Sequence, residues 1–481
     1  MKIENEKRAA GCPTPSTWKS DRRWTESLCP VCLRRLTAQR TVAGDTVHLV
    51  KTCPLHGTFE TPIWRGSPSF DQWRLDKIPT RAPECFKETN SGCPYDCGLC
   101  PGHRQRPCTV IIEVTQRCNL SCPVCYAGTP SNTPDPSLET ISRLFRRAAE
   151  AGPGSNIQLS GGEPTLRDDL PDLVAMGRDA GFDFIQVNTN GLRLGRDPSF
   201  VRALKQAGLS SVFLQFDGIG DDVYRRLRGR DLMAAKRAAV EACAHEGIGV
   251  VLVPTLVPGV NTQSIGDILE TALSWAPAVR GVHFQPISYF GRYGGKPEGA
   301  GRFTLPEVMR AIETQSGGRF SAAHLGPPGC ENALCSFNGR FLQASDGKMV
   351  PLKPSASEAC CGSPATAEAG AARAMAAVAR QWNGPQQPAT DVGCGNGCGC
   401  RPTADMPVRA DTTAPMSLDA FIHRARTHTF SVSGMAFQDA WTLALDRVQD
   451  CCIHVMAPDG NLVPFCLYNL TAADGRRLYR P

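Results

Sequence analysis

The feature of this chain that most constrains its fold is a repeated spacing of cysteines. The segments "GCPYDCGLCPGH" and "EVTQRCNLSCPVCYAG" each contain a C-x3-C-x2-C array, and the second array consists of Cys118, Cys122 and Cys125. The chain has 23 cysteines in 481 residues, and most of them stand in such clusters or in C-x2-C pairs. An odd number of clustered thiols favours metal ligation over a disulfide framework. We therefore expect a reducing, cytoplasmic environment, in which these thiols stay available for metal.

The two arrays differ in the cysteines that follow them. Three thiolates hold three irons of a [4Fe–4S] cluster and leave the fourth iron open, whereas four thiolates close the cluster and give an electron carrier. After Cys125 the next cysteine is Cys243, inside an expected helix, so the second array predicts an open, reactive cluster. The first array is followed closely by Cys108, which predicts a closed, auxiliary cluster. The expected ligands of this auxiliary cluster are Cys93, Cys97, Cys100 and Cys108.

From about residue 109, strand-like segments alternate with amphipathic helix-like segments, which is typical of a parallel α/β sheet. Asp135, Pro136 and Gly152 predict the N-cap, the first residue and the end of the first helix. Six units of this kind are too few for a closed eight-stranded barrel and predict a partial (β/α)6 TIM-type barrel. The six strand candidates are "TVIIEVT", "NIQLSGG", "FDFIQVNTN", "SVFLQFDG", "GVVLVPTLV" and "GVHFQPIS".

A second metal module is expected near the N-terminus. The segments "CPVC" and "CPLHG" flank short strand-like stretches and resemble the paired knuckles of rubredoxins and zinc ribbons. Three thiolates and one imidazole would give a tetrahedral site that suits zinc or a single iron. The expected ligands are Cys29, Cys32, Cys53 and His56, with Cys12 as an alternative to His56.

The cysteines beyond the barrel predict a second auxiliary cluster. "CENALCSF" and "CCIHVMAPDGNLVPFC" supply the expected ligands Cys330, Cys335, Cys452 and Cys466, and Cys451 lies beside them. Because no local array fixes the geometry, free buried thiols are the alternative. Cys394, Cys398 and Cys400 are a weaker metal candidate, and Cys85, Cys243, Cys360 and Cys361 are left unassigned.

The second array is followed about 40 residues later by "SGGEPT", after the second expected strand. This combination resembles the radical S-adenosylmethionine (SAM) enzymes. The resemblance implies that Cys118, Cys122 and Cys125 hold the catalytic cluster, and that the cluster and SAM together generate a 5′-deoxyadenosyl radical. It also implies that Gly161, Gly162 and Glu163 receive the SAM ammonium group. Asn190, Gln215 and Asp217 close the third and fourth strands and are expected to reach SAM or substrate, with purely structural roles as the alternative.

The whole cysteine pattern, except at about 355–415, resembles one branch of that superfamily, which includes archaeal tetraether lipid synthases and enzymes that methylate a pterin precursor. The resemblance implies three [4Fe–4S] clusters, SAM, one mononuclear iron or zinc, and an electron donor such as ferredoxin or flavodoxin. The leading expectation is carbon–carbon bond formation at a saturated carbon, as in joining lipid tails. The alternative is radical methylation of a pterin-like molecule, with a second SAM as methyl donor. A non-catalytic iron–sulfur or zinc scaffold is the rival from another class.

These modules predict the following order of segments. It runs as a polar N-terminus (1–20), a rubredoxin-like module (21–72), an auxiliary cluster segment (73–108), the core barrel (109–320), a second auxiliary cluster segment (321–354), an Ala/Gly/Pro-rich insertion or linker (355–415) and a C-terminal auxiliary cluster region (416–481). Within the insertion, "SPATAEAGAARAMAAVARQW" could form a helix.

Charge and hydropathy limit the partners of the chain. The net charge of +6 comes from interspersed residues, so nucleic acid is not implied. The basic stretch "DVYRRLRGR" predicts either a solvated helix end or contact with an anionic substrate. The N-terminus lacks an apolar signal core, and no segment is apolar enough to span a membrane. The substrate is therefore expected to be a small molecule or a lipid, with peripheral membrane contact left open.

Overall fold

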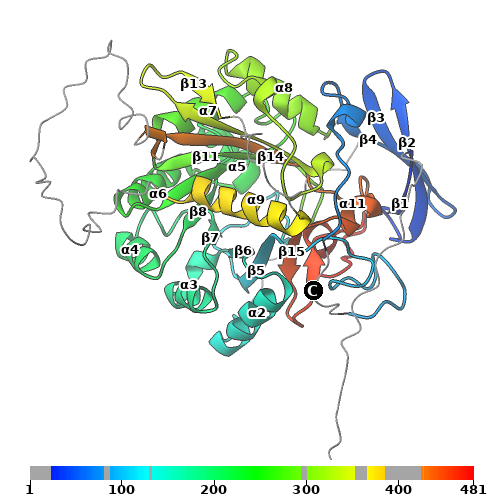
Figure 1. Cartoon of the computed structure of the whole chain (residues 1–481), viewed down its shortest axis with the longest axis horizontal. Coiled ribbons are helices and arrows are strands. Elements are labelled where there is room, and N and C mark those ends of the chain that lie inside the picture. The colour runs from blue at the N-terminus through cyan, green and yellow to red at the C-terminus, as the bar shows by residue number, and fades with distance from the viewer. Residues whose placement is uncertain are drawn as a thin grey trace, which may run out of the picture.

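The structure is a computed structural model, shown in Figure 1. It describes residues 23–80, 87–128, 133–293, 301–352, 366–384, 424–425 and 427–480. Seven of the cysteines discussed above lie outside the described residues, namely Cys12, Cys85, Cys360, Cys361, Cys394, Cys398 and Cys400.

The N-terminal module is a four-stranded antiparallel sheet, coloured blue in Figure 1. Its strands, in order, are β1 (Trp24–Leu28), β2 (Arg35–Ala43), β3 (Thr46–Cys53) and β4 (Gly57–Arg65), and a short helix, α1 (Phe70–Trp73), follows. Along β3 every second side chain is buried, which is the alternation expected for a sheet with one covered face. The buried side chain of Lys51 donates hydrogen bonds to Ser27 Oγ and to the carbonyl of Ala440, and so ties this sheet to the C-terminal region.

The six predicted barrel strands are all present, and each pairs in parallel with the next. They are β5 (Thr109–Thr115), β6 (Asn156–Gly161), β7 (Ile185–Thr189), β8 (Ser211–Gln215), β9 (Gly249–Val253) and β11 (Val279–Pro286). A two-residue strand, β10 (Thr255–Leu256), also pairs with β11. The predicted partial parallel barrel is therefore confirmed.

Amphipathic helices cover the outer face of this sheet and bury their apolar sides in one large core. They are α2 (Leu138–Ala151), α3 (Leu170–Asp179), α4 (Pro198–Gln206), α5 (Asp221–Arg228), α6 (Met233–His245), α7 (Ile265–Ser274) and α8 (Leu305–Gln315). The first of them ends at Gly152, as predicted, but its N-cap is Ser137, whose hydroxyl accepts a hydrogen bond from Thr140 N. The predicted N-cap, Asp135, instead forms an ion pair with Arg117.

The C-terminal region extends the sheet at both edges. Strand β14 (Thr429–Met435) pairs in parallel with β11, and β12 (Ser336–Gln343) and β13 (Met349–Pro351) follow it outward in antiparallel pairs. At the other edge β15 (Ile453–Met456) pairs in parallel with β5, and β16 (Leu462–Pro464) completes a hairpin. Two short helices, α11 (Leu445–Gln449) and α12 (Phe465–Tyr468), precede and follow this hairpin.

One helix, α9 (Ala367–Trp382), lies within the predicted insertion and confirms the helix expected there. It packs against β9, β11 and β14 and is the yellow helix that crosses the centre of Figure 1. Within the described part of the chain, no helix is long and apolar enough to cross a bilayer.

Candidate active site

The predicted reactive residues gather around one cavity of about 510 Å³ inside the barrel. The second cysteine array enters it from the loop after β5, and the "SGGEPT" segment enters it from the end of β6. The predicted site residues that line the cavity are Cys118, Cys122, Cys125, Gly161, Gly162, Glu163, Asn190 and Gln215, together with the predicted auxiliary ligands Cys108 and Cys330. Residues from different strand ends therefore meet at the carboxyl edge of the sheet, where barrel enzymes place their active sites.

Gly161 and Gly162 allow the two loops to touch. A Cβ atom on Gly161 would lie 2.0 Å from the carbonyl oxygen of Thr115, and one on Gly162 would lie 2.1 Å from that of Arg117. Gly161 also has a φ of +131°, which disfavours any residue with a side chain. Only glycine fits at these two positions, so the backbone after β6 lies directly against the loop that carries the cysteines.

The carboxylate of Glu163 is buried and held in one orientation. It accepts hydrogen bonds from Thr165 Oγ1 (2.6 Å), from Thr189 Oγ1 (2.7 Å) and from the backbone N–H of Asn190 (2.7 Å). These donors come from the turn after β6 and from the end of β7. The "SGGEPT" and "NTNG" segments thus form one rigid wall of the cavity.

Asp217 has the structural contacts that were the alternative expectation for this residue. In the described part of the chain, Asp217 does not line the cavity. Both of its carboxylate oxygens instead accept hydrogen bonds from the guanidinium group of Arg228, at 2.7 and 2.8 Å. Arg228 also donates to the carbonyl of Val124, inside the cysteine array, at 3.0 Å. Burial lowers the pKa of Arg228, but the charge of Asp217 outweighs this effect and leaves the pKa above its usual value. The basic stretch "DVYRRLRGR" is therefore divided, with Arg228 buried at the site and Arg225 exposed in an ion pair with Asp231.

A buried lysine supports the third and fourth strands from behind the cavity. Lys236 Nζ donates to the carbonyl of Asn190 (2.6 Å) and to Gln215 Oε1 (2.8 Å). Burial lowers the pKa of Lys236 to about 7. Nothing in the sequence pattern distinguished this lysine from the other polar residues of α6.

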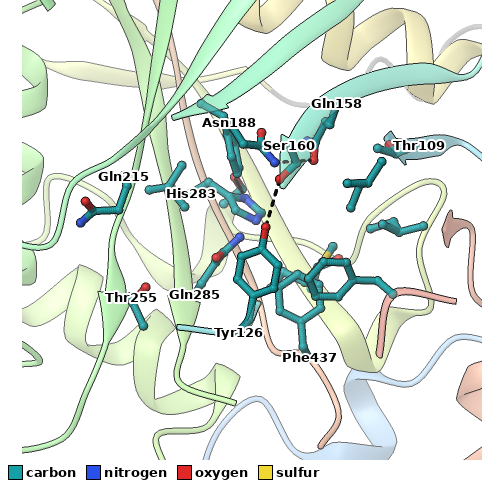
Figure 2. Close-up of a pocket in the computed structure, with 18 of the residues that line it drawn as sticks. Thr109, Tyr126, Gln158, Ser160, Asn188, Gln215, Thr255, His283, Gln285 and Phe437 are labelled. Carbon is teal, nitrogen blue, oxygen red and sulfur yellow. Dashed lines mark hydrogen bonds between the residues drawn. The ribbon is translucent and has the colours of Figure 1, made fainter. Parts of the chain in front are cut away.

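The inner face of the barrel carries polar side chains that the sequence analysis did not single out. Figure 2 shows Gln158, Ser160, Asn188, His283 and Gln285 pointing into the cavity from neighbouring strands. They alternate with buried apolar residues along each strand, and this alternation is the sequence signal that could have found them.

Tyr126, directly after the cysteine array, also points into this cavity (Figure 2). Its hydroxyl lies 3.0 Å from Ser160 Oγ, and its ring lies 5.7 Å from that of Phe465. Burial raises the pKa of the Tyr126 hydroxyl to about 12, so the group is neutral and available as a hydrogen-bond donor.

The donor set fits an open iron–sulfur cluster. Three half-buried thiols line one wall of the cavity, next to the glycine turn and the carboxylate of Glu163. Burial raises the pKa of Cys118 to about 11. Burial also raises the pKa of Cys122, against the lowering effect of Arg228. Thiols in such an environment are stabilised as thiolates by metal binding.

The N-terminal module brings its four predicted ligands together. The ligand atoms of Cys29, Cys32, Cys53 and His56 all lie within 4.8 Å of one another. Burial raises the pKa of Cys53, but hydrogen bonds from Leu55 and His56 outweigh it and lower that pKa to about 6. This arrangement suits a single tetrahedral metal ion.

The remaining described cysteines are grouped differently from the two predicted sets. Cys108 Sγ lies 2.7 Å from Cys452 Sγ and also contacts Cys330, so it joins these two rather than the Cys93 array. The pairing of β15 with β5 explains this, because it places Cys452 beside Cys108. The other groups are Cys93 with Cys97 and Cys100, and Cys335 with Cys451 and Cys466. Cys243 is a buried thiol of the helical layer.

Comparison with known proteins identifies the family. Residues 112–272 match the radical SAM superfamily, and residues 22–65 match the HMPTM N-terminal zinc ribbon domain. The chain is 31% identical over 490 residues to the 7,8-dihydro-6-hydroxymethylpterin dimethyltransferase of Methanocaldococcus jannaschii, across 92% of this chain and 93% of that protein. The chain belongs to the radical SAM superfamily. This radical SAM enzyme is also 32% identical over 161 residues to a probable GTP 3′,8-cyclase of Methanothermobacter thermautotrophicus, which covers 33% of the chain and 52% of the cyclase.

Among solved structures, Streptococcus suis SuiB aligns with 44% of the radical SAM enzyme and 46% of its own chain, at 16% identity and a TM-score of 0.38. Membership in the superfamily confirms the enzyme prediction over the non-catalytic scaffold, and it implies a [4Fe–4S] cluster and SAM. The zinc ribbon match confirms the N-terminal metal module.

Proposed function

We propose that this radical SAM enzyme methylates a carbon atom of a pterin-like small molecule. This was the alternative in the sequence analysis, where joining of lipid tails was the leading expectation. The similarity to a pterin dimethyltransferase over 92% of the chain favours methylation.

The observation that carries the proposal is the row of amide side chains on the inner wall of the barrel. Asn188 Nδ2 donates to Gln158 Oε1 at 3.3 Å, and the other end of Gln158 donates to Gln186 Oε1 at 2.9 Å. This chain of amides leaves Asn188 Oδ1 buried and without a hydrogen-bond partner among the described residues. An unpaired buried acceptor favours a ligand with N–H groups, which a pterin has and a hydrocarbon tail lacks.

Different residues of the chain have different roles in the proposed reaction. The cysteine array binds the cluster, which together with SAM supplies the 5′-deoxyadenosyl radical. The backbone at Gly161 and Gly162 and the carboxylate of Glu163 orient the SAM ammonium group. Apolar and aromatic residues around the cavity, among them Phe437 and Phe465, exclude water so that the radical meets the substrate.

We further propose two auxiliary [4Fe–4S] clusters, which give three clusters together with the catalytic one. Their ligands come from the three groups described above, namely Cys93 with Cys97 and Cys100, Cys108 with Cys330 and Cys452, and Cys335 with Cys451 and Cys466. A ferredoxin or flavodoxin would deliver electrons to them. The ribbon would hold one zinc or iron through Cys29, Cys32, Cys53 and His56. Metal and sulfide analysis of the reconstituted enzyme should then give roughly 12 iron atoms for the clusters.

The deciding experiment is an anaerobic assay of the reconstituted, reduced enzyme with 6-hydroxymethyl-7,8-dihydropterin and SAM. Mass spectrometry should detect a product heavier by one or two methyl groups, together with 5′-deoxyadenosine. A product from a lipid substrate, with none from the pterin, would overturn the proposal.

Two triple variants test which array makes the radical. Replacement of Cys118, Cys122 and Cys125 by Ala should abolish 5′-deoxyadenosine formation. The matched replacement of Cys93, Cys97 and Cys100 should leave SAM cleavage measurable and reduce methylation. If only the second variant is inactive in SAM cleavage, the two arrays have been assigned to the wrong roles.

A further inference from the structure

The end of the barrel opposite the cysteine array is unusually open. In a closed TIM barrel, layers of bulky side chains fill the interior. Here four adjacent strands carry small residues near their amino ends. They are Ser211, Gly249, Gly281 and Ser431. These positions leave room for another element to form the floor of the cavity at this end, and buried Arg280 of β11 donates to the carbonyl of Gln381 there.

Helix α9 supplies that floor. Its C-terminal end lies against the first residue of β9, since a Cβ atom on Gly249 would be 2.3 Å from the carbonyl oxygen of Trp382. One face of the helix lines the cavity along its length, at Ala374, Met375, Ala377, Val378, Gln381 and Trp382. These positions recur at helical spacing and lie on one side of the helix.

Trp382 completes an aromatic compartment at this end. Its ring centroid lies 5.7 Å from Phe213 and 6.1 Å from His283, and Phe213 lies 5.4 Å from His283. The indole N–H donates to Ser431 Oγ at 3.2 Å, which fixes the ring in place. Three planar groups from β8, β11 and α9 thus pack against one another and form one aromatic wall of the cavity, against which a flat ring can lie.

Polar groups beside this compartment are available to the ring. His283 Nδ1 lies 2.9 Å from Ser433 Oγ, and burial lowers the pKa of His283 to about 4, so the imidazole is neutral. Asn188 Oδ1 is buried and has no hydrogen-bond partner in the part of the chain that the structure describes. An amide oxygen and a neutral imidazole match the amino and ring-nitrogen groups of an aminopyrimidine.

We propose that α9 is the specificity-determining wall of the substrate site, and that Trp382 and Phe213 receive the pyrimidine half of a bicyclic heterocycle whose reactive carbons face Cys118. This inference rests on the proposed function, and it adds that a segment outside the strand-and-helix core sets how deep the substrate sits. A ring bound in the compartment has its far edge at the end of the cavity that α9 closes. Substituents on that edge are therefore excluded by the indole.

The test is the binding of 6-hydroxymethyl-7,8-dihydropterin to the anaerobic, fully reconstituted enzyme, measured beside SAM binding. Trp382→Ala should weaken pterin binding about ten-fold through the loss of ring stacking, and Trp382→Phe should retain most of it. SAM affinity should be unchanged in both. A pterin alkylated on its 2-amino group should be rejected by the wild type and should bind better to Trp382→Ala.

A second variant covers the case in which Trp382→Ala does not fold. Val378→Phe adds bulk to the cavity face of α9 and should block pterin binding while SAM still binds. Arg373→Ala, on the exposed side of the same helix, is the matched control and should behave as the wild type.

The outcomes separate the two proposals. If the wild type binds the pterin and both Trp382→Ala and Val378→Phe bind it equally well, the role of α9 is overturned and the proposed function stands. If the wild type binds no pterin, the proposed function fails, and the assignment of this compartment to a pterin fails with it.

Discussion

Arg228 connects the cysteine array to the fourth strand of the barrel. Its guanidinium group binds Asp217 on one side, in a buried ion pair, and the carbonyl of Val124 on the other. Removing one partner of such a pair costs more than the pair contributes, because a buried charge is left without compensation.

Arg228→Met should therefore lower the free energy of unfolding by about 3–5 kcal/mol. It should also reduce 5′-deoxyadenosine formation, because the array loses the contact at Val124. Chemical denaturation and an assay of SAM cleavage measure the two effects. The double variant Arg228→Met with Asp217→Asn should recover stability but not cleavage, and the exposed Arg225→Met should change stability by less than about 1 kcal/mol.

Lys236 predicts a pH dependence of stability. The folded enzyme lowers the pKa of Lys236 from 10.5 to about 7, so above pH 7 the unfolded chain binds a proton that the folded chain does not. Stability therefore rises with pH in this window, by roughly 2–3 kcal/mol between about pH 7 and pH 9 from this group alone. Unfolding of the wild type and of Lys236→Met at several pH values should show a smaller rise in the variant. Equal slopes would mean that Lys236 is charged in the folded enzyme.

At the scale of single residues, functional roles could be predicted from the sequence where they depend on local spacing. The three cysteines and "SGGEPT" carry their signal in a few adjacent positions. Arg228 and Lys236 act through contacts between helices and strands, and no local pattern distinguishes them from solvated basic residues. The choice between a ligand-binding and a structural role for Asp217 was left open for the same reason, since its partner lies 11 residues away on the next helix.

At the scale of single elements, we expect the bound metal to hold the turns that join the strands of the N-terminal sheet. Three of the four ligands lie in the turns β1–β2 and β3–β4, and Cys53 is the last residue of β3. The sheet contacts the C-terminal region through the ion pair of Arg40 with Asp446. Loss of the metal should release both turns while the barrel keeps its own core.

Cys29→Ser should remove one bound zinc or iron per chain and lower the thermal stability of the ribbon, while SAM cleavage by the barrel persists. Metal analysis, together with proteolysis at residues 22–65, measures the change. Cys243→Ser, at a buried thiol outside all of the clusters, is the control and should keep the full metal content. Unchanged metal content in Cys29→Ser would contradict the assigned ligand set.

Elements with a strong local pattern were predicted well. The six parallel strands and the first of their helices follow from the alternation of apolar segments, and α9 follows from its helix-forming composition. The strands β12, β14 and β15 were missed as barrel partners because their pairing is non-local. The regrouping of Cys108, Cys330 and Cys452 has the same origin, since sequence distance suggested a different fourth ligand.

On the scale of the whole molecule, the end of the described chain reaches back to the first barrel strand. Arg480 forms a buried ion pair with Glu113 of β5 and donates to Asn469 Oδ1 at 2.8 Å. Its guanidinium carbon also lies 5.8 Å from the ring centre of Tyr126, at the cavity wall.

Arg480→Met should destabilise the enzyme by about 3 kcal/mol, because Glu113 would be left buried and unpaired. Adding Glu113→Gln should restore much of this loss, which chemical denaturation of the single and double variants would reveal. Arg476→Met, whose partner Asp474 is exposed, should be close to neutral. A single variant as stable as the wild type would contradict this role of the ion pair.

The pairing of β15 with β5 also has a consequence for biosynthesis. Cys108 and Cys452 are 344 residues apart in sequence, yet their sulfur atoms are in contact. During translation, one edge of β5 stays without its strand partner until almost the entire chain has left the ribosome. Any cluster that bridges these cysteines can be delivered only to the completed polypeptide, so the cell must keep the nascent chain reduced and unaggregated until its iron–sulfur assembly machinery takes over.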